Sequence, residues 1–167
     1  VHVPLGRIQP NRQNNIVLMS PNKTFNVGGL MTASVIIPDP RLMEQYRKVL
    51  NMWAMNLDTT FGTIAVETLY EHPDCEAWLD AVVPYLKRNV EYVTDFVNGQ
   101  IEGVKTRHPQ GTYLMWLDFT ETGLRGTELK EFLVREAKLD LSDGKEFDPA
   151  NDTHMRMNLG CTFATAK

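Results

Sequence analysis

Cysteine is scarce in this chain, and a strong charge bias and long apolar runs are missing. Cys75 and Cys161 are the two cysteines among 167 residues, and their spacing fits no metal or redox motif, so we expect two reduced thiols. The net charge is −4 with no basic stripe, which argues against a nucleic-acid partner. The longest apolar runs, such as residues 113–117, are too short to span a membrane.

The composition is that of an ordinary globular protein. Hydrophobic residues make up 43% of the chain and charged residues 23%, which is enough for one or two small domains with a core. Residues 1–4 carry no helix or strand pattern and no Met precedes them, and residues 162–167 stop without a finished element. We therefore expect the chain to be a piece of a longer protein.

Residues 1–75 alternate strand and helix patterns. Residues 16–19 form a four-residue apolar run that is typical of a strand buried on both faces, and residues 32–37 predict a second such strand. Asp39 followed by Pro40 predicts the start of a helix, and residues 59–72 predict another. This part of the chain therefore reads as α/β.

Residues 76–167 have a different texture. A long amphipathic helix comes first, with Pro84 inside it and apolar residues at steps of three and four. Strands are predicted over residues 101–106 and 112–119, followed by a helix capped by Thr127. Residues 154–159 then alternate, with Met155, Met157 and Leu159 facing one way and Arg156 and Asn158 the other. We interpret residues 76–167 as a smaller α+β unit that the long helix connects to the first.

The most informative local feature is the end of the first predicted strand, where Ser20 and Lys23 precede a Gly28-Gly29 turn. Ligands of open α/β sheets bind beyond the carboxyl ends of strands. A hydroxyl and exposed backbone N–H groups suit a phosphate, and a lysine in a partly dry pocket can attack a carbonyl as the free amine. Taken by itself, a lysine in a turn is more often simply solvated.

The segment around Lys23 resembles the Schiff-base segment of class I/II aminotransferase-like enzymes, which have fold type I and use pyridoxal 5′-phosphate (PLP). It is most similar to the cystathionine β-lyase branch, the MalY–PatB type of C–S lyase, which reads Ser-x-Ser-Lys-Thr-Phe-Asn-x-x-Gly-Leu. The matching residues are Ser20, Lys23, Thr24, Phe25, Asn26, Gly29 and Leu30. Asn22 stands where the branch has serine, and it can still donate and accept hydrogen bonds.

Four further motifs follow in the order of that branch and extend the resemblance over the whole chain. They are a His-x-Pro at residues 2–4, a Gly-Thr-Tyr-Leu-x-Trp-Leu-Asp strand at residues 111–118, a Gly-x-x-Phe turn at Gly144 and Phe147, and an arginine segment at residues 155–158. The resemblance implies that Lys23 holds PLP as a Schiff base and moves the substrate α-proton. It also implies that Ser20 contacts the PLP phosphate and that Arg156 clamps the substrate α-carboxylate in a bidentate pair.

The resemblance implies the carboxyl-terminal half of such an enzyme. Its fold would be α/β, with residues 1–75 ending a large PLP-binding domain of mostly parallel sheet and helices, and residues 76–167 forming an incomplete small α+β domain. The expected reaction is α,β-elimination on cystathionine or cysteine-like amino acids, giving pyruvate, ammonia and a thiol. We expect a cytoplasmic homodimer with a small amino-acid substrate, no nucleic acid, no membrane and no metal.

Two alternatives stay open. An aminotransferase would use the same lysine and arginine, although many aminotransferases have a phosphate-binding arginine where this chain has Met31. The chain could also be an inactive structural fragment, because no Asp for the pyridine nitrogen, no ring-stacking aromatic and no phosphate loop is found in it. We expect residues 1–167 alone to be inactive.

Tyr113 and Trp116 are assigned to core packing, and His108 and His154 to no role.

Overall fold

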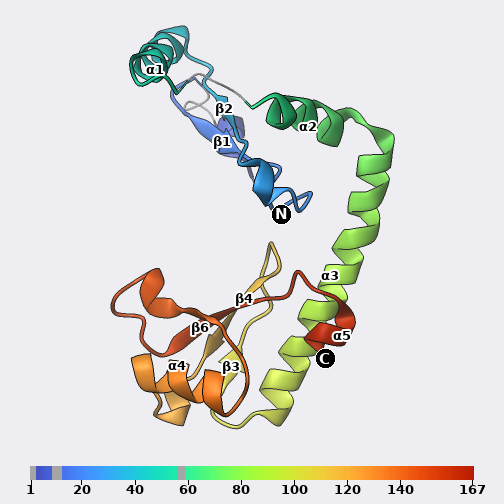
Figure 1. The fold of residues 1–167 in the computed structure, drawn as a ribbon, viewed down its shortest axis with the longest axis vertical. Coiled ribbons are helices and arrows are strands. Elements are labelled where there is room, and N and C mark those ends of the chain that lie inside the picture. The colour runs from blue at the N-terminus through green and yellow to red at the C-terminus, as the bar shows by residue number, and fades with distance from the viewer. Residues whose placement is uncertain (1–2, 9–12, 56–58) are drawn as a thin grey trace. The chain divides into compact units, whose positions relative to one another are not determined.

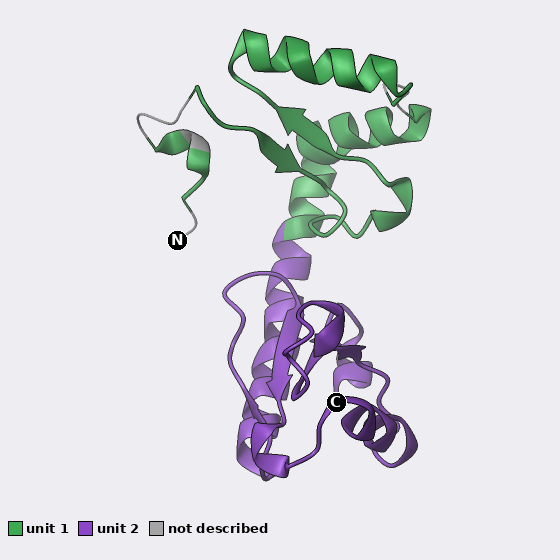
Figure 2. Cartoon of the chain, turned by 90° about the vertical axis from the view of Figure 1, so that its left-hand side faces the viewer, with its two compact units in different colours: residues 1–79 green, residues 80–167 purple. Residues whose placement is uncertain are grey.

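The computed structural model describes residues 3–8, 13–55 and 59–167 (Figure 1). The chain divides into two compact units, Val1–Leu79 and Asp80–Lys167, which are coloured separately in Figure 2. One helix, α3 (Pro73–Gln100), contributes residues to both. None of the helices in the described ranges is long and apolar enough to cross a membrane.

The first unit is built from two strands and two helices. Strand β1 (Val17–Met19) pairs antiparallel with β2 (Ser34–Ile36), and the connection contains a turn and a short 3-10 helix, Gly28–Leu30. Helices α1 (Pro40–Met52) and α2 (Thr60–Glu71) follow, and a further 3-10 helix, Leu5–Arg7, precedes the strands. The strands and helices predicted for this part of the chain are therefore confirmed, with small shifts in their ends.

Both helices begin after a residue whose side chain caps them, and the sequence indicated the first of these caps, Asp39. Asp39 Oδ1 accepts hydrogen bonds from the backbone N–H groups of Arg41 at 2.7 Å and Leu42 at 3.2 Å. The N–H groups of Leu42 and Arg41 lower the pKa of the Asp39 carboxyl, because they stabilise its charged form. Thr59 Oγ1 accepts from the N–H of Gly62 at 3.1 Å at the start of α2.

The prediction that β1 and β2 are buried on both faces is wrong. Leu18 in the middle of β1 is 73% exposed, and Ile16 and Ile36 are also exposed. Two antiparallel strands of three residues each form a ribbon that buries little apolar surface. These two strands run antiparallel, and the mostly parallel sheet expected for the large domain as a whole stays a prediction. Their apolar edges are of the kind that pairs with further strands.

The second unit contains a four-stranded antiparallel sheet in the order β3-β4-β6-β5. The strands are β3 (Lys105–Thr106), β4 (Leu114–Asp118), β5 (Ser142–Asp143) and β6 (His154–Asn158). Around the sheet are α4 (Gly126–Arg135), α5 (Phe163–Ala166) and two 3-10 helices, Thr120–Thr122 and Gly144–Glu146. In the register of the two central strands, Trp116 of β4 lies opposite Arg156 of β6.

One face of this sheet is buried, and the other is open. The buried face packs against the carboxyl-terminal part of α3 and against α4; its core consists of Val90, Val93, Val97, Val104, Met115, Leu117, Phe119, Leu129, Leu133, Met155 and Leu159. Met155 is 1% exposed, whereas its neighbour Arg156 lies on the other face. The predicted alternation of residues 154–159 is therefore confirmed.

Backbone groups of the second unit set the start of one helix and fix the segment after β6. The prediction that Thr127 caps helix α4 is wrong, because the helix already begins at Gly126. The N–H of Gly126 donates to the carbonyl of Asp152 at 2.7 Å and sets this start. Asn89 of α3 is fully buried, and its Nδ2 donates to the carbonyl oxygens of Leu159 at 3.2 Å and Cys161 at 2.9 Å. The segment after β6 is thereby tied to α3.

We predict that the core of the second unit dominates its stability. Leu129→Ala removes a side chain that is 0% exposed and should lower the free energy of unfolding by about 2–5 kcal/mol. The control, Val134→Ala in the same helix, truncates a side chain that is 44% exposed and should change it by less than about 1 kcal/mol. Urea denaturation of the whole protein measures both, and equal losses would contradict the assigned core.

Candidate active site

The Lys23 segment is a tight turn that directly follows β1. Pro21 is fully buried at its start, and the N–H of Phe25 donates to the Pro21 carbonyl at 2.9 Å. The Lys23 side chain is exposed. The turn therefore holds its backbone firmly while its lysine amine stays accessible, and the lysine lies beyond the carboxyl end of a strand as predicted.

The hydroxyl of Ser20 makes two hydrogen bonds, one as donor and one as acceptor. Its Oγ donates to the carbonyl of Thr32 at 2.9 Å and accepts from the N–H of Asn22 at 3.2 Å. A hydroxyl has one hydrogen to donate, so a contact between Ser20 and a phosphate would replace the bond to Thr32. The exchange is open to Ser20, because its side chain is exposed.

Aromatic packing anchors the turn from behind. Phe25 is buried, with its ring edge-on to Tyr70 of α2 at a centroid distance of 5.4 Å and stacked with Trp78 of α3 at 6.4 Å. Asn22 Oδ1 is buried and has no hydrogen-bond partner within the described part of the chain. An unpaired buried oxygen is costly, so the turn is suited to accept a hydrogen bond from a group outside it.

Arg156 lies in the middle of the open face of the second unit's sheet. On one side its strand neighbour is Trp116, and on the other it is Ser142 of β5. Arg156 Nη2 donates to Ser142 Oγ at 3.4 Å, and the guanidinium carbon lies 4.3 Å from the centre of the Phe147 ring. A guanidinium has five N–H donors, so most of them remain for a ligand such as a carboxylate.

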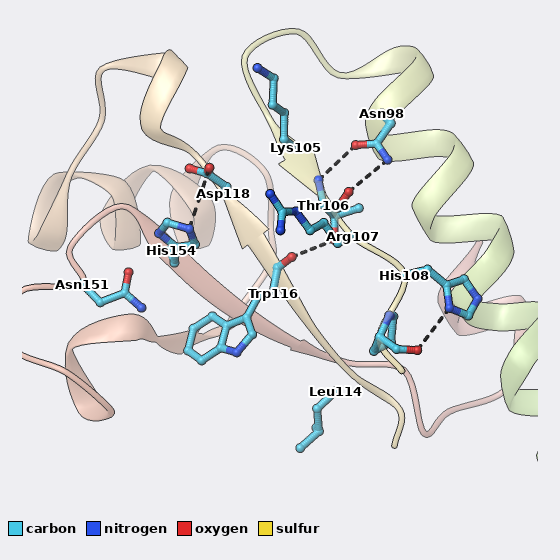
Figure 3. A pocket seen from close by; sticks show the side chains of 11 residues that line it. Asn98, Lys105, Thr106, Arg107, His108, Leu114, Trp116, Asp118, Asn151 and His154 are labelled. Atoms are coloured by element: carbon cyan, nitrogen blue, oxygen red, sulfur yellow. Dashed lines mark hydrogen bonds and ion pairs between the residues drawn. The ribbon is translucent and has the colours of Figure 1, made fainter. Parts of the chain in front are cut away.

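A cavity of about 800 Å³ opens on the same face (Figure 3). Trp116 and His154 line this cavity. Trp116 lies opposite Arg156 on the neighbouring strand, and His154 precedes Arg156 by two positions on the same strand. Lys105, Arg107 and Asp118 add charged groups of both signs. The volume is within the usual range for small-molecule sites, about 300–1,000 Å³. The assignment of Trp116 to the core is thus wrong, because β4 turns Met115 and Leu117 inward and Trp116 outward.

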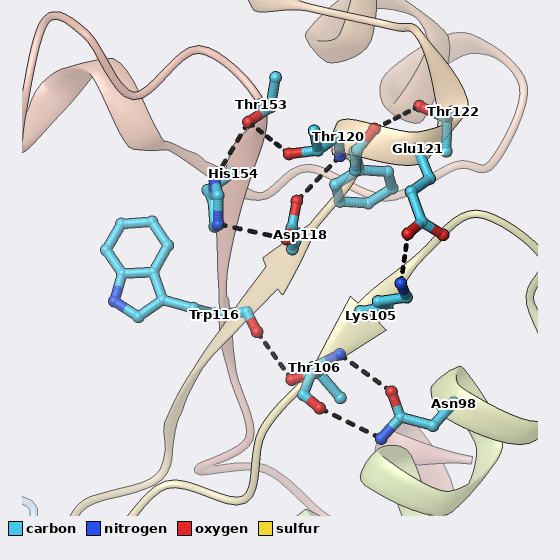
Figure 4. A network of polar contacts seen from close by, with 11 residues as sticks. Asn98, Lys105, Thr106, Trp116, Asp118, Thr120, Glu121, Thr122, Thr153 and His154 are labelled. Carbon is cyan, nitrogen blue, oxygen red and sulfur yellow. Dashed lines mark hydrogen bonds and ion pairs between the residues drawn. The ribbon is translucent and has the colours of Figure 1, made fainter.

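A polar network lies along one side of this cavity (Figure 4). Asp118 Oδ2 lies 3.8 Å from His154 Nε2, and Asp118 Oδ1 accepts from the N–H of Thr120 at 2.9 Å. The side chain and backbone N–H of Thr120 lower the pKa of the Asp118 carboxyl, and His154 and Lys105 add to this effect. Sequence reasoning assigned His154 no role, since its partner Asp118 is 36 positions away in the sequence.

Known proteins resemble this chain over nearly its full length. Cystathionine β-lyase PatB of Bacillus subtilis is 29% identical over 98% of the chain, and Protein MalY of Escherichia coli is 27% identical over 96%. The resemblance to the MalY–PatB cystathionine β-lyases is confirmed. The chain spans 42% of the length of PatB and 40% of that of MalY. No protein-family model matches it.

Solved structures agree with these relatives. A PLP-bound protein from Clostridium difficile superposes with a TM-score of 0.92 at 30% identity, covering 99% of this chain and 42% of its own. Cystalysin from Treponema denticola, which contains PLP, gives 0.86 at 27% identity, covering 92% and 39%. An aromatic aminotransferase from Pyrococcus horikoshii shares the fold, with a TM-score of 0.88 at 19% identity over 99% and 43%. The chain therefore has the α/β fold of PLP-dependent aminotransferase-like proteins.

The predicted site residues are distributed over both units. Ser20 and Lys23 share one turn of the first unit, and Arg156 belongs to the second. Their roles stay predictions. His2 of the expected His-x-Pro motif lies outside the described residues, and Val3 and Pro4 are exposed.

The lowered pKa of Asp118 predicts a pH dependence of stability. Because the folded-state pKa lies below the ordinary value of 3.8, the carboxylate stabilises the fold fully above that pH. This contribution is lost as the pH falls through the lower folded-state pKa. The wild type should thus be more stable than Asp118→Asn at pH 7, and the difference should shrink towards pH 3.

Urea denaturation midpoints between pH 7 and pH 3 measure this difference. Asp140→Asn, at an exposed position of the same unit, controls for the loss of one negative charge. A difference between wild type and Asp118→Asn that stays constant over this range would show that the network does not favour the charged carboxylate.

Proposed function

We propose that the whole protein is a PLP-dependent C–S β-lyase that eliminates a sulfur leaving group from the β-carbon of cystathionine or cysteine-like amino acids. Its products are pyruvate, ammonia and a thiol. The observation that carries this proposal is the match of 98% of the chain to a protein named cystathionine β-lyase. We further propose that residues 1–75 belong to a large PLP-binding domain and residues 76–167 to an incomplete small carboxyl-terminal domain.

Three side chains have distinct tasks in this proposal. Lys23, accessible on an anchored turn, binds PLP and moves the proton of the substrate α-carbon with its Nζ. Ser20 exchanges its bond to Thr32 for one to the phosphate. Arg156 binds and orients the substrate α-carboxylate through parallel N–H donors. When bound, PLP supplies the electron sink that stabilises the negative charge left on the α-carbon.

An aminotransferase is the second candidate. Aspartate aminotransferase of Pyrococcus horikoshii is 23% identical over 99% of the chain, and an aminotransferase would use the same Lys23 and Arg156. Met31 favours the lyase instead, since its exposed thioether side chain cannot pair with a phosphate. We also propose that the protein works as a homodimer in the cytoplasm on small amino-acid substrates.

We predict that the full-length protein, incubated with PLP and cystathionine, releases pyruvate and that Lys23 carries the cofactor. Borohydride reduction followed by peptide mapping should find the pyridoxyl group on Lys23. Lys23→Ala should abolish turnover and keep the circular dichroism spectrum, because the exposed side chain contributes little packing. Lys48→Ala, at an exposed lysine of α1, is the matched control and should retain activity.

Two results would contradict this assignment. Label on another lysine would exclude Lys23 as the cofactor-binding residue. Amino-group transfer to an oxo acid without pyruvate release would favour the aminotransferase instead.

We predict that Arg156→Lys retains PLP and raises KM about ten- to a hundredfold. An ammonium cannot reproduce the bidentate geometry of a guanidinium, and a charge-assisted hydrogen bond contributes about 1.5–3 kcal/mol. Steady-state kinetics with cystathionine measure the effect, and Arg135→Lys, on α4, is the control. An unchanged KM in Arg156→Lys would remove Arg156 from the substrate site.

A further inference from the structure

The guanidinium of Arg156 is held from two directions by one short segment, Ser142 to Phe147. Ser142 Oγ accepts from Nη2 at 3.4 Å, and the Phe147 ring lies 4.3 Å from the guanidinium carbon. The guanidinium carbon thus lies over the ring, and the hydroxyl contacts one of its nitrogens. These two contacts engage the guanidinium carbon and Nη2, and the N–H groups of Nη1 and Nε can serve another partner.

The Phe147 ring also contacts a second aromatic ring. Trp116, which lies opposite Arg156 across the sheet, packs edge-on against Phe147 with centroids 5.3 Å apart and an interplanar angle of 88°. Phe147 is nevertheless 49% exposed and does not belong to the core. The ring contacts of Phe147 on this face are with the Trp116 ring and the Arg156 guanidinium.

The backbone of this segment has little room to move. Gly144 is buried, and a Cβ at this position would lie 2.5 Å from the His154 carbonyl oxygen and 2.6 Å from that of Asn151. The N–H of Phe147 donates to the Gly144 carbonyl at 3.0 Å. The turn is thus packed closely against the start of the strand that carries Arg156.

We propose that Phe147 and Ser142 are positioning residues that hold the Arg156 guanidinium in the orientation in which it binds the substrate carboxylate. This inference rests on the proposed role of Arg156. An arginine on the open face of a sheet otherwise samples many rotamers, and each binding event has to order it. The stack and the hydrogen bond order it beforehand, so their loss weakens carboxylate binding while the chemical step is left largely unchanged.

Variants of the full-length, PLP-loaded protein test this. Phe147→Leu should raise KM for cystathionine about three- to thirtyfold, as expected from the strength of a cation–π contact, with kcat within about twofold. Phe147→Tyr keeps an aromatic face and should restore KM. Phe132→Leu makes the same change at a phenylalanine of α4 that is 44% exposed and should have no effect.

A binding measurement separates positioning from general damage. Propionate carries a carboxylate, and propionamide has the same shape without the charge. Isothermal titration without substrate should show Phe147→Leu weakening propionate binding by the same factor as KM and leaving propionamide unaffected. Equal losses for both compounds, or an equal fall in kcat, would overturn the inference in favour of a structural role.

Arg156→Lys, measured alongside, separates this inference from the proposed function. If Arg156→Lys leaves KM and propionate affinity unchanged, the role of Arg156 itself fails. If Arg156→Lys weakens both and Phe147→Leu weakens neither, only the positioning inference fails. Should Phe147→Leu not fold, Ser142→Ala provides the test. It also should raise KM for cystathionine and the dissociation constant of propionate. Unchanged values of both would overturn the inference.

Discussion

One-sided burial of the sheet β3-β4-β6-β5 is the constraint on which the second unit depends. Met115 and Met155 point into a core closed by α3 and α4, and the period of two along a strand then forces their neighbours to the open face. Trp116 and Arg156 are opposite each other for this reason. A shift of one residue in this register would exchange the arginine and a methionine between water and core, so the fold and the position of the guanidinium are specified by the same pattern.

The open face of the sheet gathers side chains from segments far apart in the chain. Strand β4 supplies Trp116 and Asp118, β6 supplies His154 and Arg156, and the turn after β5 adds Phe147. The first unit uses a comparable arrangement on a smaller scale, because the buried ring of Phe25 anchors a turn whose lysine stays accessible. In both units an apolar anchor fixes the backbone, and a cationic side chain next to it is left available for an anionic or carbonyl-containing ligand.

The sequence predicted correctly those features that depend on residues close together in the chain. Alternation around Arg156 predicted its face, and Asp39 with Pro40 predicted the start of α1. The pattern predicted the wrong burial for Leu18, since an apolar run indicates a strand but does not show which elements cover its faces. It also failed at Thr127, where the backbone bond from Gly126 to Asp152 sets the helix start, and it missed the pair of Asp118 and His154. The pair of Asp118 and His154 depends on the register of β4 and β6, which places the two residues opposite each other although they are 36 positions apart.

We propose that Lys23 binds PLP and that Arg156 binds the substrate carboxylate. A crystal structure of the full-length protein with PLP and propionate tests it most directly. We expect continuous density from Lys23 Nζ to the cofactor. It also predicts the carboxylate within hydrogen-bond distance, about 2.7–2.9 Å, of two guanidinium nitrogens of Arg156. PLP on another lysine, or a propionate bound by a different cation, would contradict it.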